Sequence, residues 1–239
     1  MSMNDHNLTL HLIELRKRFI FILIGFLIVF AILFHFDNRI FDYLAKPLFA
    51  YLPKTSNLVA TDIIAPFFTP LKLSIMLAIF ISLPNTFIQI WAFIAPALYL
   101  HEKKIGAYCV IIAILLFAIG ISFCYFLVLP ILFKFINSVA SPNITIMADI
   151  TKYLDLILNL FLIFGICFET PLIIYLLIHF KILPINTLKK ARPYIFVASF
   201  IIAAILAPPD ILSQILLAIP LYLLYEVGIF FAWLLIPIT

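Results

Sequence analysis

The sequence predicts an all-α membrane protein with six transmembrane helices, and three observations support this prediction. Of the 239 residues, 66% are hydrophobic and only 11% are charged, whereas soluble domains carry about 25% charged residues. The apolar residues gather in long runs, which prolines and short polar segments separate. Lysines and arginines are concentrated in alternate connecting segments, the bias that marks cytoplasmic loops. We therefore expect one membrane domain over 1–239, with both termini cytoplasmic.

The N-terminal segment, 1–18, is polar with an apolar stripe in which Leu8, Leu12 and Leu15 recur at helical spacing. This pattern predicts a short amphipathic helix on the cytoplasmic membrane surface. The apolar run that follows, 19–36, is long enough to span a bilayer. A cleaved signal peptide is the alternative interpretation, but no small-residue cleavage site follows the run, so we retain it as the first span.

The middle of the chain supplies three further spans, which we place at about 69–91, 105–135 and 153–180. We expect 37–67 to form short helices that cap the outer surface, and 137–152 to form a second outer loop. Prolines interrupt both regions, which makes one long helix unfavourable in either. Pro130 is expected to bend the outer end of the third span.

The last two spans, 194–207 and 211–235, are expected to be short. Each begins with an apolar run of only about 14 residues, too few to cross a 30 Å hydrocarbon core comfortably. They are either short spans in a thinned bilayer or a re-entrant pair. Pro208-Pro209-Asp210 between them is a turn signal, which favours two short spans.

The charge distribution sets the expected topology. The predicted cytoplasmic segments hold nine lysines and arginines against three acids, which are Asp5, Glu14 and Glu102. The predicted outer segments hold six basic and six acidic residues. Only Glu169 and Glu226 remain within the membrane. This bias orients the six helices with both ends inside.

The segment 91–104, between the second and third spans, is the candidate recognition surface. Trp91, Phe93 and Tyr99 suit the lipid headgroup level, and Lys103 marks the cytoplasmic side. Glu102 is a lone acid on this otherwise apolar and basic connection. Two simpler interpretations remain open: Glu102 as a solvated acid neutralised by Lys103, and the aromatic residues as interfacial anchors.

Glu169, near the middle of the fourth span, is the second candidate site. A carboxylate at this depth costs several kcal/mol, so it should face protein or a water-filled concavity, or be protonated. Pro171 removes one helical hydrogen bond nearby and leaves the Cys167 carbonyl free. Gln214 and Glu226 on the last span offer polar partners, and we add Asp210 to this intramembrane polar set.

Several functional classes find little support. The five histidines form no metal pair on one helix face, and the chain lacks a phosphate-binding glycine loop. The cysteines lie in apolar runs and are expected to be packing residues: Cys109, Cys124 and Cys167. The net charge of +4 is too small to indicate a nucleic-acid partner. We expect no enzyme activity, cofactor or metal. A proton-coupled transporter that uses Glu169 and Glu226 as a relay is the alternative to a receptor.

A set of motifs resembles one family along nearly the whole chain. The motifs are His11-Leu-Ile-Glu14-Leu-Arg16-Lys-Arg18, Pro66-Phe-Phe-Thr-Pro70-Leu-Lys72, Trp91-Ala-Phe93-Ile-Ala-Pro96-Ala-Leu-Tyr99 with Glu102, Phe168-Glu169-x-Pro171, Arg192-Pro-Tyr194 and Pro208-Pro-Asp210-x-x-Ser213-Gln214. Together and in this order they resemble the TatC component of the twin-arginine protein translocase.

The resemblance implies a fold and a function. The expected fold is a concave, glove-like arrangement of six helices with a short fifth and sixth. The expected protein is the receptor and core scaffold of the translocase, which binds twin-arginine signal peptides at the cytoplasmic face. It would recruit single-span TatA- and TatB-like proteins into a multi-copy hetero-oligomer in the lipid of the bacterial inner membrane. This complex would export folded cargo proteins with the proton-motive force.

We assign the signal-peptide site from the resemblance and from the chemistry of guanidinium recognition. Two arginines on a peptide need carboxylate acceptors, and Glu14 and Glu102 are the candidates. The residues alone leave Glu14 open between this role and an i,i+4 pair with Arg18. The site residues are Glu14, Arg16, Phe93, Tyr99, Glu102 and Lys103.

Overall fold

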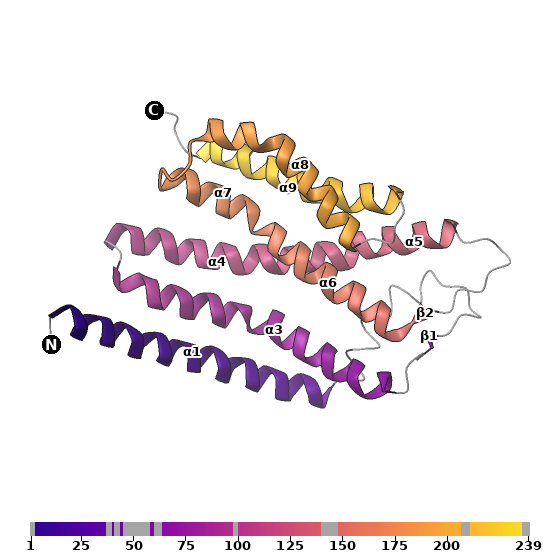
Figure 1. Cartoon of the computed structure of the whole chain (residues 1–239), viewed down its shortest axis with the longest axis horizontal. Helices are drawn as coiled ribbons and strands as arrows, with labels where there is room; N and C mark the ends of the chain where they lie inside the picture. The colour runs from indigo at the N-terminus through magenta and orange to yellow at the C-terminus, as the bar shows by residue number, and fades with distance from the viewer. Residues whose placement is uncertain are drawn as a thin grey trace. The chain divides into compact units, whose positions relative to one another are not determined.

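The computed structural model is almost entirely helical (Figure 1). It describes residues 3–36, 40, 44, 58–59, 64–97, 100–139, 148–206 and 211–235. Only the backbone is described at 3–11, 58–59, 65–66, 97, 100–102, 136–139, 148, 212–213 and 235. The chain divides into two compact units. The first comprises Met1–Tyr43 and Pro66–Ile114, and the second Leu44–Ala65 and Leu115–Thr239. The boundary therefore falls inside one helix, α4 (Leu100–Phe123).

The first unit begins with α1 (Met3–His35), one uninterrupted helix of 33 residues. The expected surface helix and the first span are thus continuous. The second helix, α3 (Ala65–Ile94), runs antiparallel to α1 (Figure 1). The Asn85 side-chain amide donates to the Phe21 carbonyl at 3.3 Å. A Cβ at Gly25 would overlap the same amide, so glycine allows the two backbones to approach closely here.

A second close approach joins α3 to the start of α4. A short 3-10 helix, Ala95–Ala97, follows α3, and α4 begins at Leu100. Trp91 on α3 packs directly on Gly106 of α4, where a Cβ would overlap the indole ring. The indole is large and rigid, so this contact determines how closely the end of α3 packs on the start of α4.

The third span continues into the second unit and contains a π-helical turn there. After α4 the chain forms a π-helix at Cys124–Val128 and then α5 (Leu129–Val139). Pro130 has no N–H to donate to the carbonyl four residues earlier, and a π-helical turn is one way in which a helix absorbs such a gap. The π-helical turn lies directly before Pro130, where the sequence predicts a bend.

The fourth span is divided at Glu169. Helix α6 (Ile150–Phe168) ends there and α7 (Thr170–His179) begins one residue later. Pro171 cannot donate to the Cys167 carbonyl, and the Glu169 N–H bonds the Ile166 carbonyl at 3.0 Å. Our expectation that Pro171 leaves the Cys167 carbonyl without its helical donor stays a prediction.

The start of α6 is fixed by its N-terminal cap. Asp149 accepts hydrogen bonds from the Thr151 N–H at 2.8 Å and the Lys152 N–H at 2.9 Å. These are donors that have no partner within the helix itself. Asp149 also ends a two-residue strand, β2 (Ala148–Asp149), which pairs in parallel with β1 (Leu58–Val59). This small ladder is an addition to the expected all-α fold.

The last two helices, α8 (Ile185–Leu206) and α9 (Ile211–Leu235), contain 22 and 25 residues. They are shorter than α1 and α3, with 33 and 30 residues. Helix α8 begins at Ile185, nine residues before the span that we predict at 194–207. Leu188 anchors this basic first part of α8 in an apolar core with Ile174, Tyr225, Ile229 and Ala232.

Five helical segments in the described part of the chain are long and apolar enough to span a membrane. They are Leu12–His35, Phe67–Ile94, Lys103–Phe135, Ile150–His179 and Gln214–Leu234. The short, partly basic α8 is not among them. Most of the expected outer cap, 37–67, and the middle of the second outer loop, 140–147, lie outside the described residues.

Candidate functional site

The described members of the predicted recognition site lie at one end of the first unit. Glu14 and Arg16 belong to the N-terminal half of α1, Phe93 to the last turn of α3, and Lys103 to the first turn of α4. Arg16 is exposed, whereas Glu14, Phe93 and Lys103 are half-buried. The backbone of Glu102 lies in the first turn of α4, but its side chain and the whole of Tyr99 lie outside the described residues.

A guanidinium group joins α1 to α3 at this end, and our sequence analysis did not assign it to the site. Arg18 Nη2 lies 3.4 Å from Glu14 Oε1, which confirms the i,i+4 pair. Arg18 Nη1 donates to Gln89 Oε1 at 3.2 Å, and Nη2 also to the Ala92 carbonyl at 3.5 Å. We refer to Glu14, Arg18, Gln89 and Ala92 as the Arg18 cluster.

The Ala92 carbonyl needs a donor from outside its own helix. In a continuing α-helix it would bond the N–H of residue 96, but residue 96 is a proline. Ala92 also lies in the last turn of α3, where the helix dipole favours a positive charge. Arg18 provides both the donor and the charge. Pro96, four residues after Ala92, was the sequence signal that could have revealed this contact.

Glu14 keeps acceptor capacity in this arrangement. A carboxylate has about four lone-pair sites, and one guanidinium at 3.4 Å does not saturate them. The Glu14 side chain is 33% exposed. The ion pair with Arg18 and a role as an acceptor for a second cation are therefore compatible, and the two interpretations left open by the sequence do not exclude each other.

The intramembrane polar residues follow a different pattern. Glu226 on α9 is paired with Arg192 on α8, with 2.7 Å between Arg192 Nη2 and Glu226 Oε2. The Tyr222 hydroxyl donates to Glu226 Oε1 at 2.7 Å. The sequence does not predict this pair, because the two residues are 34 positions apart.

Glu169 and Gln214 are not part of that pair. Gln214 donates through Nε2 to the Phe200 carbonyl at 3.0 Å, which ties α9 to α8. Glu169 is half-buried, and its Oε1 is buried without a hydrogen-bond partner among the described residues. The described contacts do not join Glu169 to Glu226, as a proton relay would require. Asp210 lies outside the described residues.

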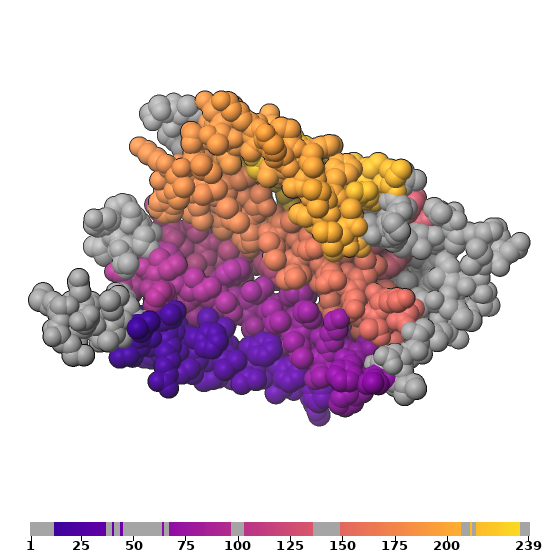
Figure 2. All heavy atoms as spheres, viewed as in Figure 1, coloured from indigo at the N-terminus to yellow at the C-terminus, as the bar shows by residue number. Residues whose placement is uncertain are grey.

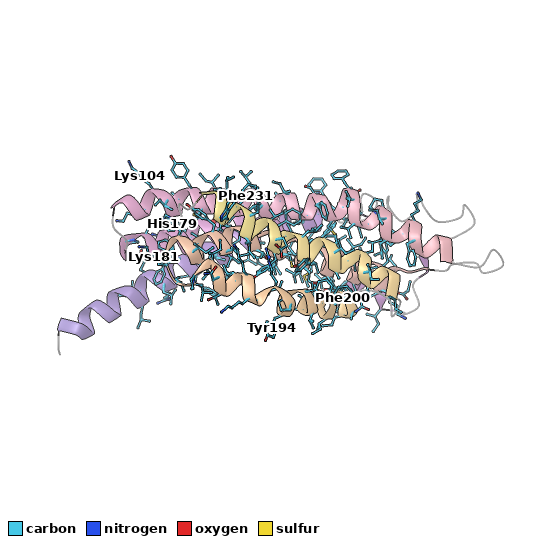
Figure 3. The ribbon with its side chains drawn as sticks, turned by 90° about the horizontal axis from the view of Figure 1, so that it is seen from above. Lys104, His179, Lys181, Tyr194, Phe200 and Phe231 are labelled. Carbon is cyan, nitrogen blue, oxygen red and sulfur yellow. The ribbon has the colours of Figure 1, made fainter. Side chains whose placement is uncertain are left out.

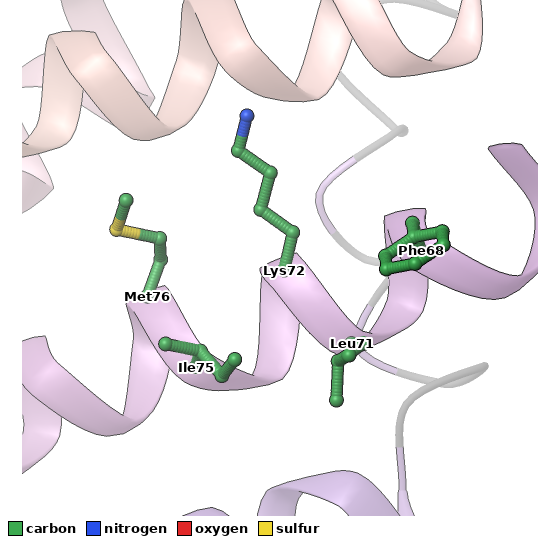
Figure 4. A pocket seen from close by; sticks show the side chains of 5 residues that line it. All are labelled: Phe68, Leu71, Lys72, Ile75 and Met76. Atoms are coloured by element: carbon green, nitrogen blue, oxygen red, sulfur yellow. The ribbon is translucent and has the colours of Figure 1, made fainter.

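A pocket of about 270 Å³ lies along the first turns of α3 (Figure 4). Its lining consists of Phe68, Leu71, Lys72, Ile75 and Met76. It contains none of the predicted site residues and lies at the opposite end of α3 from Gln89 and Ala92. No group of histidines, cysteines and acids suited to a metal ion occurs in the part of the chain that the structure describes.

Comparisons with known proteins agree on one family. The family model described as Sec-independent protein translocase protein (TatC) matches residues 10–220. A protein of this name from Haemophilus influenzae is 47% identical over 222 residues, which cover 93% of this chain and 87% of the relative. Another from Escherichia coli K12 is 43% identical over 233 residues, which cover 97% of this chain and 90% of the relative.

Solved structures give the same result. A crystal structure of the Twin Arginine Translocase Receptor TatC superposes with a TM-score of 0.82 at 38% sequence identity. The match covers 94% of this chain and 98% of that one. A second crystal structure of this receptor, in the detergent DDM, superposes with a TM-score of 0.81 at 36% identity, covering 93% of this chain and 99% of that one.

Proposed function

Because this chain belongs to the TatC family of translocase components, a family of transport proteins rather than enzymes, we propose that it is the receptor for twin-arginine signal peptides. The peptide would bind at the end of the first unit that carries Glu14, Phe93 and the start of α4. The charge bias of the sequence places this end at the cytoplasm. The chain itself is a multi-pass membrane protein, and we infer that its membrane is the bacterial inner membrane.

One observation supports the proposal: Glu14 on α1 and Phe93 on α3 lie at the same end of the first unit. Arg18 links Glu14 on α1 to Ala92, the residue before Phe93 on α3. Only five residues separate α3 from α4, so the backbone of Glu102, in the first turn of α4, belongs to the same end. Two carboxylates would thus be available for two guanidinium groups, with Phe93 beside them for the apolar residues of a signal peptide.

A lysine- and arginine-rich surround supports recognition by geometry rather than by net charge. Arg16, Lys17 and Lys104 are exposed at this end and repel any cationic peptide. A bidentate guanidinium–carboxylate contact offsets this repulsion, whereas an ammonium group interacts as a point charge. The proposed receptor should therefore prefer twin-arginine to twin-lysine peptides.

The test is the affinity of the purified full chain, in lipid nanodiscs, for a fluorescent twin-arginine signal peptide. We expect Glu102→Ala to abolish measurable binding and Glu14→Ala to weaken it. Loss of one partner of a desolvated interfacial charge pair costs about 2–5 kcal/mol, and less at an open rim. Lys104→Gln is the matched control, since it changes one exposed charge in the same turn of α4 and should not weaken binding. Unchanged affinity in Glu102→Ala and in the double Glu14→Ala, Glu102→Ala variant would refute the proposal.

We further propose that single-span TatA- and TatB-like helices pack on α8 and α9 in a multi-copy complex, which moves folded cargo at the expense of the proton-motive force. Exposed apolar side chains form stripes at helical spacing on both helices. The stripe on α8 comprises Tyr194, Val197, Ile201 and Ile205, and that on α9 comprises Ile219, Leu223, Val227 and Phe230. Tyr194 points outward (Figure 3), and α8 lies at the molecular surface (Figure 2). Such stripes suit helix packing within a membrane.

A further inference from the structure

We propose that Arg18 is a positioning residue of the peptide site, which holds the Glu14 carboxylate against the end of α3. In this view Arg18 does not itself bind the peptide. The inference rests on the proposed function, because it concerns the arrangement of the same site. It is drawn from the Arg18 cluster, in which one guanidinium reaches acceptors on two helices.

The geometry of the cluster favours a guanidinium over a point charge. Nη1 donates to Gln89 while Nη2 serves both Glu14 and the Ala92 carbonyl. A planar group with several fixed N–H directions can serve three acceptors on different elements, and a lysine ammonium at the end of a flexible chain is far less able to hold that geometry. The Arg18 side chain is 30% exposed, so its hydrogen bonds are partly shielded from water.

The two anchors on α3 determine where Glu14 is held. Gln89 and Ala92 lie three residues apart, so they occupy one face of α3 near its end. The Ala92 carbonyl depends on Arg18 for a donor, because Pro96 cannot supply one. Without Arg18, Glu14 would be a flexible side chain on the surface of α1. With Arg18 it is held beside the residue that precedes Phe93.

A positioning role for Arg18 and a purely electrostatic effect of its charge predict opposite changes in peptide affinity when Arg18 is removed. Arg18 is a positive charge next to the acid that is proposed to attract a cationic peptide. If only charge mattered, removal of Arg18 would tighten peptide binding. If Arg18 orients Glu14, its removal weakens binding although the repulsion falls.

The experiment measures affinities of the full chain in nanodiscs for a twin-arginine peptide and a matched twin-lysine peptide. We expect Arg18→Gln and Arg18→Lys each to weaken twin-arginine binding by about tenfold, the size of one lost charge-assisted hydrogen bond. Binding of the twin-lysine peptide should change less, since it lacks the bidentate contact. Lys17→Gln, the neighbouring exposed charge, is the control and should stay within about twofold of the wild type or bind more tightly.

A double-mutant cycle separates positioning from a general effect on structure. In a Glu14→Ala background, Arg18→Gln should add less than about a twofold further loss, because Arg18 acts through Glu14. A purely structural role would give the full loss in both backgrounds and would overturn the inference. Gln89→Met, which keeps the side-chain volume but removes the oxygen acceptor, should weaken binding about threefold. If thermal unfolding shows that the Arg18 variants are not folded, the affinity of Gln89→Met tests the positioning role instead.

The outcomes distinguish this inference from the proposed function. Wild-type affinity in Arg18→Lys, or tighter binding in Arg18→Gln, would overturn the positioning role. The receptor function would still stand if Glu102→Ala lost binding in the same assay. Unchanged affinity in Gln89→Met would also count against the positioning role. A wild-type chain that binds neither peptide would overturn the receptor itself, and the role of Arg18 with it.

Discussion

The two acids within the membrane have different environments, and this difference separates their expected roles. Glu226 has an arginine and a tyrosine hydroxyl as partners, each at 2.7 Å. Glu169 lies at the break between α6 and α7 and has a buried oxygen without a partner among the described residues. Buried polar groups normally find a hydrogen bond, so an unpaired one is a candidate for a role outside folding.

We therefore predict that Glu169→Gln keeps the fold and peptide binding but impairs a later step of translocation. The substitution removes the charge at nearly constant volume, and Glu169 has no described ion pair to lose. The measurements are the export of a folded twin-arginine reporter by cells and the peptide affinity of the purified protein. Normal export, or loss of peptide binding, would contradict the prediction.

Glu226→Gln is the informative comparison. It leaves Arg192 without its carboxylate, and breaking a partly buried pair should destabilise the packing of α8 on α9. We expect a lower unfolding temperature for this variant than for Glu169→Gln, because only Glu226 is engaged in a described ion pair.

Single residues also show what the sequence could predict about the site. The Glu14–Arg18 pair follows from a spacing of four residues on a helix. The Arg18–Gln89 bond joins residues 71 positions apart, and its existence depends on how α1 packs on α3. Neither charge nor periodicity encodes that register, so Arg18 could be assigned only from the structure.

At the scale of elements, apolar runs predicted where helices exist better than where they begin. Hydropathy placed six spans, but it does not show that α8 extends back to Ile185, because the first turns of α8 are basic and are held by the burial of Leu188. Pro171 indicated a local disruption of the fourth span, and the structure has a division into two helices at Glu169. Burial and hydrogen bonding determine helix ends, and both depend on neighbours that are distant in the sequence.

The turn after α7 contains a lysine in a backbone conformation that favours glycine. Lys181 adopts a left-handed conformation, with φ of 55°, and the Ile182 N–H bonds the Leu177 carbonyl at 2.9 Å. This is a C-terminal cap at which glycine is the favoured residue. Lys181→Gly should therefore stabilise the protein by about 1 kcal/mol, because glycine avoids the steric cost of this conformation.

The measurement is thermal unfolding in detergent, with Lys181→Ala as the matched control. Alanine also removes the charge but keeps the Cβ, so it should bring no comparable gain. Equal stabilisation by alanine and glycine would show that the lysine charge, rather than the backbone conformation, sets the cost.

At the scale of the whole molecule, the apolar surface is the dominant feature. Large hydrophobic side chains are exposed along every candidate span, as expected for a chain whose solvent is lipid. Membership of a translocase family implies a multi-subunit complex, so part of this surface should be covered by protein.

We predict that the α8 stripe is one such part. A photo-crosslinking residue at Ile201 should capture a TatA- or TatB-like single-span helix in the native membrane, since Ile201 is 56% exposed in the apolar stripe of α8. The matched control is Ile28 on α1, which is also 56% exposed and should react mainly with lipid. Crosslinks at Ile28 to those partners, with none at Ile201, would contradict the assignment.

The lack of buried side chains along the apolar part of α1 should let its sequence diverge between relatives. No residue in the apolar window of Leu12–His35 is buried within the chain, and lipid tails do not distinguish leucine from isoleucine, valine or phenylalanine. Most positions of α1 should therefore exchange one apolar residue for another at little cost. Gly25, which Asn85 approaches closely, and Arg18 should not. Two lineages could keep the same first helix, in the same place, with few identical residues beyond these.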